Sequence, residues 1–231
     1  MIIPEDRPVY LRVSGLATYL FCPKRSKIQL FNNPKIYGKE RGAVAKGIKL
    51  HQQYEYMMYN VGFDRTLVKY KLGWTPLKVF EKQVPNTNII IRGKPDDLRT
   101  IINKKDNKKY TVLLELKTTG RKMIRREIYC AMKQLQLYMW LLKDKLEEIG
   151  FPLWKHGIVE IYSQRTGELL KRYSVEYDDN IEEWIKHVVK TFTGEEPLNV
   201  PEDNRYCKKC PQAIRNVCSW YEMMKKQNIK I

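Results

Sequence analysis

The spacing of apolar residues along the chain predicts four helices. The longest extends from Ile124 to Ile149, where apolar residues recur in steps of three and four, the period of one helix face, at positions 128, 132, 135, 139, 142, 146 and 149. A helix that starts at the N-cap residue Ser14 should end near Phe21, just before a Cys-Pro pair. Two further helices are expected at about 43–59 and 181–192.

Shorter apolar runs between turn residues predict strands. The expected strands are 77–84, 88–91, 98–102, 110–116, 158–163 and 168–175. Turns at Pro85-Asn86, at 103–109 and at Arg165-Thr166-Gly167 separate them. The run YTVLLEL at 110–116 is β-branched and apolar enough for a central strand. The order of helices and strands, with no internal repeat, indicates a mixed α/β fold.

The charge of the chain indicates a polyanionic partner. Lys and Arg number 43 against 26 acidic residues, for a formal charge of +17, and such an excess attracts phosphate backbones. No run approaches the roughly 18–20 apolar residues that span a bilayer, and the first ten residues carry acids and prolines in place of a signal peptide's apolar run. We therefore expect a cytoplasmic protein without a membrane partner. The sequence leaves the oligomeric state open, with a homo-oligomer as one alternative.

Acidic residues and a lysine accompany the central strands. Asp96 is expected at the end of one strand and Glu115 on the next, where the two carboxylates could meet across a sheet. Lys117 shares the face of Glu115 because side chains alternate along a strand. Carboxylate oxygens, with the Leu116 carbonyl, suit Mg²⁺ or Mn²⁺, and a lysine beside the metal can hold the attacking water. The alternative is a solvated strand edge with a turn carboxylate at Asp96 or Asp97.

Three short motifs resemble those of a known family. They are Gly93-Lys94-Pro95-Asp96, Glu115-Leu116-Lys117 and Gln134-Leu135-Gln136-Leu137-Tyr138. Their order and spacing resemble the GxxD, ExK and QxxxY motifs of RecB-like PD-(D/E)XK nucleases. The resemblance implies a restriction-endonuclease-like core, with a mixed central sheet flanked by helices, and makes Asp96, Glu115 and Lys117 the catalytic residues. His51, on a predicted helix face with Gly47, resembles the histidine that supplies a further metal ligand in the family. The resemblance thus implies a metal held by His51, Asp96, Glu115 and the Leu116 carbonyl.

Further residues are candidates for DNA binding. Gln134 and Tyr138 match the pair that, in the family, lies beside the site and helps to position DNA. Lys122 and Arg125 lie at the start of the predicted long helix, near where a scissile strand must pass, and are expected to bind phosphates. The alternatives are helix packing for Tyr138 and a solvated helix face for the two cations.

The chain has five cysteines: Cys22, Cys130, Cys207, Cys210 and Cys218. Without an export signal, reducing conditions disfavour disulfides, so metal or cluster ligation is the better explanation. The last three, with Cys22, would join both ends of the chain in one site. Four thiolates suit tetrahedral zinc or an iron–sulfur cluster. Cys130, inside the predicted long helix, is expected to be a packing residue.

The layout of one N-terminal and three C-terminal cysteines resembles that of iron–sulfur nucleases of the RecB-like class, which include a CRISPR-associated exonuclease and AddB-type recombination nucleases. It implies a [4Fe–4S] cluster held by Cys22 and the three C-terminal cysteines. A nuclease domain would cover 1–200 and a cysteine-rich iron–sulfur module 201–231. Seven residues separate Cys210 from Cys218, more than is usual in the family, so a [2Fe–2S] cluster or zinc stays open.

The compact chain, without a helicase domain, is most similar to the stand-alone CRISPR-associated exonuclease. The resemblance implies Mg²⁺- or Mn²⁺-dependent cleavage of DNA from single-stranded 5′ ends. It also implies a role in CRISPR spacer acquisition, trimming DNA beside the spacer integrase complex. Two alternatives stay open: a viral or DNA-repair nuclease with the same core, and a cluster- or zinc-stapled DNA-binding protein whose acidic site is inactive.

Overall fold

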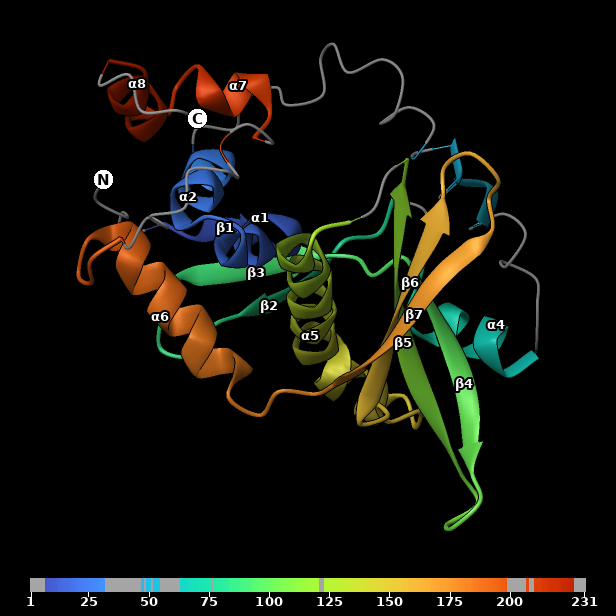
Figure 1. Ribbon diagram of the computed structural model, residues 1–231. Coiled ribbons are helices and arrows are strands. Elements are labelled where there is room, and N and C mark those ends of the chain that lie inside the picture. Colours follow the sequence, from blue (N-terminus) through green and yellow to red (C-terminus); the bar gives the residue numbers. More distant parts are fainter. Residues whose placement is uncertain are drawn as a thin grey trace.

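The computed structural model describes residues 7–31, 47, 49–50, 52–54, 63–75, 77–120, 123–198, 207 and 210–226. Within these residues the strands form two mixed sheets with helices packed against them (Figure 1). The mixed α/β fold expected from the sequence is therefore confirmed. Of the helix expected at 43–59, the described residues are helical, and the rest, with His51, lies outside the described residues.

The first sheet has the strand order β1-β3-β2. Its strands are β1 (Val9–Arg12), β3 (Ile89–Gly93) and β2 (Phe80–Gln83). β1 runs parallel to β3, and β2 runs antiparallel to it. The predicted turn between β2 and β3 is present and contains Asn86 with a φ of 61°. β2 begins three residues later than expected, because Leu77 is 92% exposed and precedes the strand.

The second sheet has the strand order β4-β5-β6-β7. Its strands are β4 (Asp97–Asn103), β5 (Lys108–Thr119), β6 (His156–Ser163) and β7 (Leu169–Glu176). β5 is antiparallel to β4 and parallel to β6, and β6 and β7 form the expected hairpin. β5 lies between two strands and its middle is buried, as predicted for a central strand.

The expectation of one central sheet is corrected, since the strands of the described residues divide into two sheets between β3 and β4. The division falls at Lys94, Pro95 and Asp96, which belong to no strand. Pro95 lacks the N–H that a strand ladder needs, which favours a break here. Asp96 therefore lies in a bend directly before β4 and not at the end of a strand.

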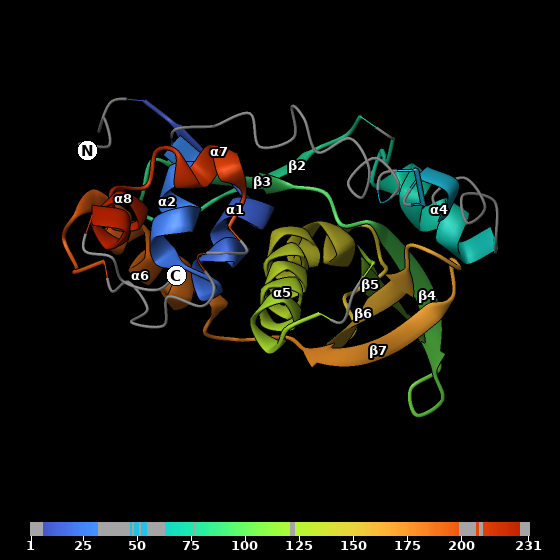
Figure 2. The ribbon, with the colours of Figure 1, turned by 45° about the horizontal axis from the view of Figure 1, so that its top comes forward.

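The predicted long helix is α5 (Arg125–Glu148). It packs against strands of both sheets, and the second sheet curves around it (Figure 2). Residues of its predicted stripe, such as Leu135 and Met139, are fully buried. At its start, the Ile124 N–H donates to the Glu127 carboxylate at 3.0 Å, which satisfies one free helix N–H. The opposite face of the second sheet contacts α4 (Phe63–Lys71), a helix not predicted from the sequence.

The N-terminal and C-terminal helices of the described residues lie together. The N-terminal helices are α1 (Val13–Ala17), the short 3₁₀ helix η1 (Thr18–Leu20) and α2 (Pro23–Phe31). The C-terminal helices are α6 (Ile181–Thr193), α7 (Gln212–Arg215) and α8 (Ser219–Lys226). α2 contacts α7, and the Lys24 ammonium donates to the Ser219 hydroxyl at 2.7 Å. The predicted domain boundary at residue 200 lies outside the described residues.

No helix among the described residues is both long and apolar enough to cross a bilayer. The cytoplasmic location expected from the sequence stays a prediction.

Candidate active site

The pairing of β4 with β5 brings two predicted catalytic carboxylates together. Asp97 is in register with Leu114, so Asp96, one residue earlier, comes beside Glu115. The Leu116 N–H donates to Asp96 Oδ2 at 2.7 Å. Since the N–H and C=O of one strand residue point to the same side, the Leu116 carbonyl is directed to the same edge as Asp96.

Glu115 and Lys117 project from the same face of β5, the face covered by α5. Glu115 is buried, with 1% of its surface exposed, and pairs with the ammonium of Lys117. Burial opposes the charge of Lys117, but the charges of Glu115 and Asp96 outweigh it and raise the lysine's pKa above its ordinary value. Lys117 is therefore an ammonium at neutral pH and acts as a hydrogen-bond donor.

Gln134 and Tyr138 of α5 complete this group. Lys117 Nζ donates to Gln134 Oε1 at 3.2 Å, and Gln134 Nε2 donates to the Tyr138 hydroxyl at 3.2 Å. Because an ammonium only donates, Gln134 must present its oxygen to Lys117 and its NH₂ to the tyrosine. Burial raises the pKa of Tyr138 well above its ordinary value, and the charges of Glu115 and Asp96 raise it further, so the hydroxyl stays neutral.

Gly93 is the residue that lets Tyr138 approach β3. A Cβ at Gly93 would lie 2.7 Å from Cε1 of Tyr138 and 2.9 Å from Cγ2 of Val13. Only glycine leaves room for the ring at this place. The first and third family motifs are thus in direct contact in the structure.

Asp97 has a different role from its neighbour Asp96. It is 1% exposed and pairs with Arg65 and with Lys69, the latter at 2.8 Å, both from α4. These contacts hold α4 on the face of the sheet opposite α5. The structure therefore assigns Asp97 to packing and leaves Asp96 beside Glu115.

A third buried carboxylate, Glu160 of β6, was not predicted. It is fully buried and pairs with Arg99 at 3.2 Å and Arg172 at 2.7 Å, and it accepts from the Tyr162 hydroxyl at 2.7 Å. Glu160 is in register with Leu116 and so faces away from Glu115. Its signal in the sequence is an acid inside the apolar run at 158–162, and its partners satisfy it structurally.

The donors at Asp96 and Glu115 fit a divalent cation. Two carboxylates converge beside a strand carbonyl, and oxygen donors are those that Mg²⁺ and Mn²⁺ prefer. Two of the predicted site residues, His51 and Lys122, lie outside the described residues. Among the residues that are described, no three His, Cys, Asp or Glu side chains are arranged to hold a metal ion.

Arg125 lies apart from this group. It donates to the Tyr129 hydroxyl at 2.6 Å, and its guanidinium lies 5.3 Å from the centre of that ring. Together they line a groove of about 700 Å³ that also includes Arg126 and Lys133. Arg125 is thus on a basic surface of α5, where it pairs with Tyr129, whereas Lys117 pairs with Gln134.

The four cysteines predicted to form one site lie close to one another. Cys22 directly precedes α2, Cys210 precedes α7, and the Cys210 N–H donates to the Cys207 carbonyl at 3.1 Å. The pKa of Cys210 is raised to about 11, mainly by burial; Arg25 opposes this rise, and the other three thiols of this set add to it. Four thiols from the N-terminal and C-terminal segments therefore share one region, but among the described residues they are not arranged as a metal-binding group. Sulfur donors are those that an iron–sulfur cluster or zinc takes.

Cys130 belongs to α5 and not to this set. Burial raises the pKa of Cys130 to about 11, although the cations Arg25 and Lys117 oppose the shift. Its thiol is therefore protonated at neutral pH, and its position one helical turn before Gln134 places it in the packing between α5 and the N-terminal helices.

The fold and the site together define a nuclease. Two mixed sheets lie against one long helix, with paired carboxylates and a lysine on the covered face. The PD-(D/E)XK nuclease superfamily matches residues 34–219, and the chain belongs to this superfamily.

One solved structure agrees with this fold. The crystal structure of the protein SSO0001 aligns with a TM-score of 0.58 at 18% sequence identity, over 93% of this chain and 86% of that chain. A protein from Eubacterium rectale, provisionally named an exonuclease, aligns with a TM-score of 0.46 at 11% identity, over 91% of this chain and 93% of that chain. A comparison with curated proteins found no match.

Proposed function

We propose that the protein is a metal-dependent DNA exonuclease that hydrolyses phosphodiester bonds. The observation that carries the proposal is the convergence of Asp96 with Glu115 and Lys117, through the Asp96 contact with the Leu116 N–H and the Glu115–Lys117 ion pair. Membership of the nuclease superfamily supports it. The polycationic chain, at +17, suits a DNA substrate.

Asp96, Glu115 and the Leu116 carbonyl would hold Mg²⁺ or Mn²⁺, with His51 as a further ligand by resemblance. When bound, the cation supplies neutralisation of the phosphate charge and acidification of the attacking water. The buried Glu115 carboxylate has few competing water contacts, because 1% of its surface is exposed.

Lys117 acts as a charged donor. Its raised pKa keeps it protonated, so it would orient the attacking water or a phosphate oxygen rather than take a proton. Gln134 restrains the lysine from the helix side, and Tyr138 restrains Gln134. Glu115 and Gln134 thus contact the ammonium directly and Tyr138 restrains Gln134, which is the preorganisation that electrostatic catalysis requires.

We also propose that Gln134, Tyr138, Lys122 and Arg125 contribute to DNA binding and that the substrate has single-stranded ends, cleaved from the 5′ end. The test is degradation of DNA labelled at either end, with and without Mn²⁺, by the wild-type protein and by Asp96→Ala and Glu115→Ala. Metal-dependent loss of the 5′ label as mononucleotides by the wild-type protein alone is expected. Equal degradation by all three proteins would overturn the assignment.

Cys22, Cys207, Cys210 and Cys218 are proposed to hold a [4Fe–4S] cluster. Their shared region supports the proposal, because four sulfur donors that lie together suit an iron–sulfur cluster. Protein purified without air should be brown, with about four iron atoms per chain for this cluster type. A colourless preparation that contains zinc would contradict the cluster, and two iron atoms per chain would indicate [2Fe–2S].

The resemblance extends the proposal to CRISPR spacer acquisition, in which the nuclease would trim DNA beside the spacer integrase complex. The test is spacer acquisition in cells that carry the wild-type gene or Glu115→Ala. Spacers of correct length only with the wild-type gene would support this role. Unchanged acquisition would favour a viral or repair nuclease.

A further inference from the structure

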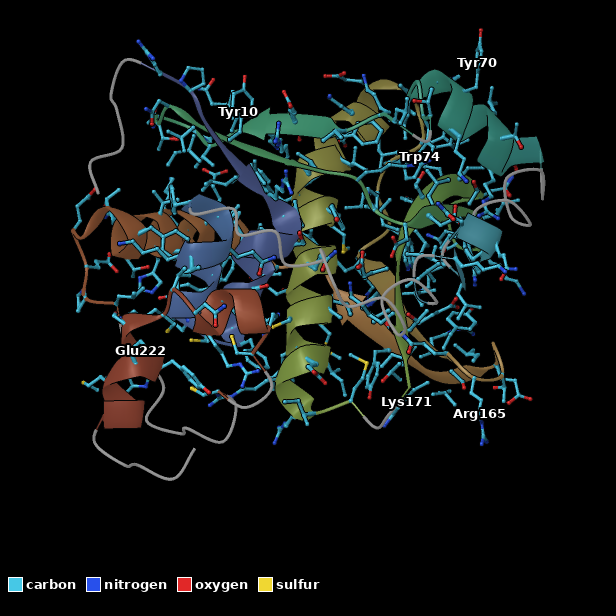
Figure 3. All side chains as sticks on the ribbon, turned by 90° about the horizontal axis from the view of Figure 1, so that it is seen from above. Tyr10, Tyr70, Trp74, Arg165, Lys171 and Glu222 are labelled. Atoms are coloured by element: carbon cyan, nitrogen blue, oxygen red, sulfur yellow. The ribbon has the colours of Figure 1, made fainter. Side chains whose placement is uncertain are left out.

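A groove of about 550 Å³ opens beside the proposed active site, between the start of α5 and the β6–β7 hairpin. Its lining includes Ile128, Ile161, Arg165, Leu170, Lys171 and Tyr173. The volume is in the range of sites that bind small ligands or parts of larger ones. Figure 3 shows Lys171 and Arg165 near each other at the hairpin end of the molecule.

The groove continues the face of the sheet that carries the catalytic lysine. Lys117 is in register with Ile161 of β6, and Ile161 is in register with Lys171 of β7. Paired residues face the same side of a sheet, so these three side chains form one row across it. Neighbouring strands are about 4.8 Å apart, which places the Lys171 backbone roughly 10 Å from that of Lys117.

The charge of the groove suits a polyanion. Its described lining residues include two cations, Arg165 and Lys171, and no carboxylate. A groove at the other end of α5 provides a contrast, because its lining mixes lysines with Glu147, Glu176 and Asp179. The groove beside Lys117 is thus cationic, whereas the distant one has mixed charge.

The floor of the groove is apolar and aromatic. Leu170 is 56% exposed although it is a large apolar residue, and the Lys171 ammonium lies 5.2 Å from the centre of the Tyr173 ring. Aromatic and apolar surface rimmed by cations binds single strands, whose bases are free to stack, while a duplex keeps its bases stacked inside.

We propose that this groove binds the unpaired nucleotides next to the scissile phosphate of a single DNA strand. Tyr173 stacks against a base, and Lys171 and Arg165 contact the phosphates on either side. This inference rests on the proposed nuclease function, since it concerns the strand that reaches Lys117. It assigns the preference for single-stranded DNA to the β6–β7 hairpin.

The test measures binding of a fluorescent single strand and of a matched duplex to the full-length protein in EDTA, where no metal-dependent cleavage occurs. Tyr173→Leu keeps apolar packing but removes the stacking face, and it should weaken single-strand binding roughly tenfold. Duplex binding should be unchanged, and Tyr173→Phe should bind like the wild-type protein. Lys171→Gln should reduce the slope of log K against log salt concentration by about 0.7, the value for one phosphate contact.

The pair Lys143 and Tyr177 supplies the matched control. The Lys143 ammonium lies 4.8 Å from the centre of the Tyr177 ring. This pair therefore has the same chemistry as Lys171 and Tyr173, but it lines the distant groove. Tyr177→Leu should leave single-strand binding unchanged. Equal weakening by Tyr173→Leu and Tyr177→Leu, or equal weakening of single-strand and duplex binding by Tyr173→Leu, would overturn the proposal.

Binding in EDTA separates this proposal from the proposed nuclease function. A selective loss of single-strand binding by Tyr173→Leu supports the groove even if the wild-type protein cleaves no DNA. Metal-dependent cleavage with no binding defect in Tyr173→Leu, when the variant shows a wild-type unfolding temperature, supports the nuclease and overturns the groove.

Discussion

Gly93 and Tyr138 are in such close contact that a methyl group on the glycine would lie 2.7 Å from Cε1 of the tyrosine ring. The contact joins Gly93 at the end of β3, three residues before Asp96, to the helix residue that restrains Gln134. The side-chain size at Gly93 in the first motif therefore limits where the Tyr138 ring of the third motif can lie.

Gly93→Ala should destabilise the protein by about 1–3 kcal/mol, the usual cost of overpacking. It should also slow cleavage, because displacement of Tyr138 releases Gln134 and Lys117. Urea unfolding and single-turnover rates measure the two effects. In a Tyr138→Leu background the same change should cost less, since the ring is gone. An additive double mutant would contradict the contact.

Gln134→Leu should slow cleavage by roughly 10- to 100-fold, the loss typical of groups that orient a catalytic side chain. It keeps a helix-forming side chain of similar size, so stability should change little. Gln136→Leu is the matched control, because Gln136 donates to the Glu176 carbonyl at 3.0 Å on the exposed side of α5. Similar rates for both variants would argue against the role of Gln134.

The adjacent residues Asp96 and Asp97 should separate activity from stability. Asp97→Ala leaves the buried cations Arg65 and Lys69 without their carboxylate, which should cost about 3–5 kcal/mol. Asp96→Asn keeps an acceptor for the Leu116 N–H, so it should fold normally while losing cleavage. Urea unfolding and cleavage assays on both variants test this, and the reverse pattern would refute the assignment.

Because of Cys130, the free energy of unfolding should change with pH in the alkaline range. Its pKa is about 11 in the folded protein against an ordinary value of 9.0, so between these values the folded state holds a proton that the unfolded state has lost. Stability must therefore fall as pH rises through this window, and the contribution is fully present below it. The difference in unfolding free energy between wild type and Cys130→Ala should shrink from pH 8 to pH 11. A difference that is constant with pH would contradict the shift.

Much of the fold follows from local patterns in the sequence. The stripe of α5 and the runs that form β5, β6 and β7 have periods that a window of residues reveals. β1 and α4 were missed: β1 is four residues long and pairs with β3 about 80 residues away. Such long-range pairing leaves no signal within a short window of residues. The local pattern of apolar residues therefore could not predict that the strands divide into two sheets.

The candidate site, like the fold, could be predicted only in part from local patterns. Glu115 and Lys117 are two residues apart, so strand alternation alone predicts their shared face. Whether Asp96 or Asp97 joins them depends on the register of β4 and on the cations of α4, which the sequence pattern does not specify. The row from Lys117 to Lys171 likewise depends on a parallel pairing between β5 and β6.

The most direct test of the central claim is the single-turnover cleavage of a labelled single strand in Mn²⁺ by wild type, Glu115→Gln and Glu148→Gln. Glu148 is exposed at the far end of α5 and serves as the control. Wild type and Glu148→Gln should cleave at equal rates, EDTA should abolish cleavage, and Glu115→Gln should be slower by at least about 100-fold, as for loss of a group that stabilises the transition state. Equal rates for wild type and Glu115→Gln would contradict the account.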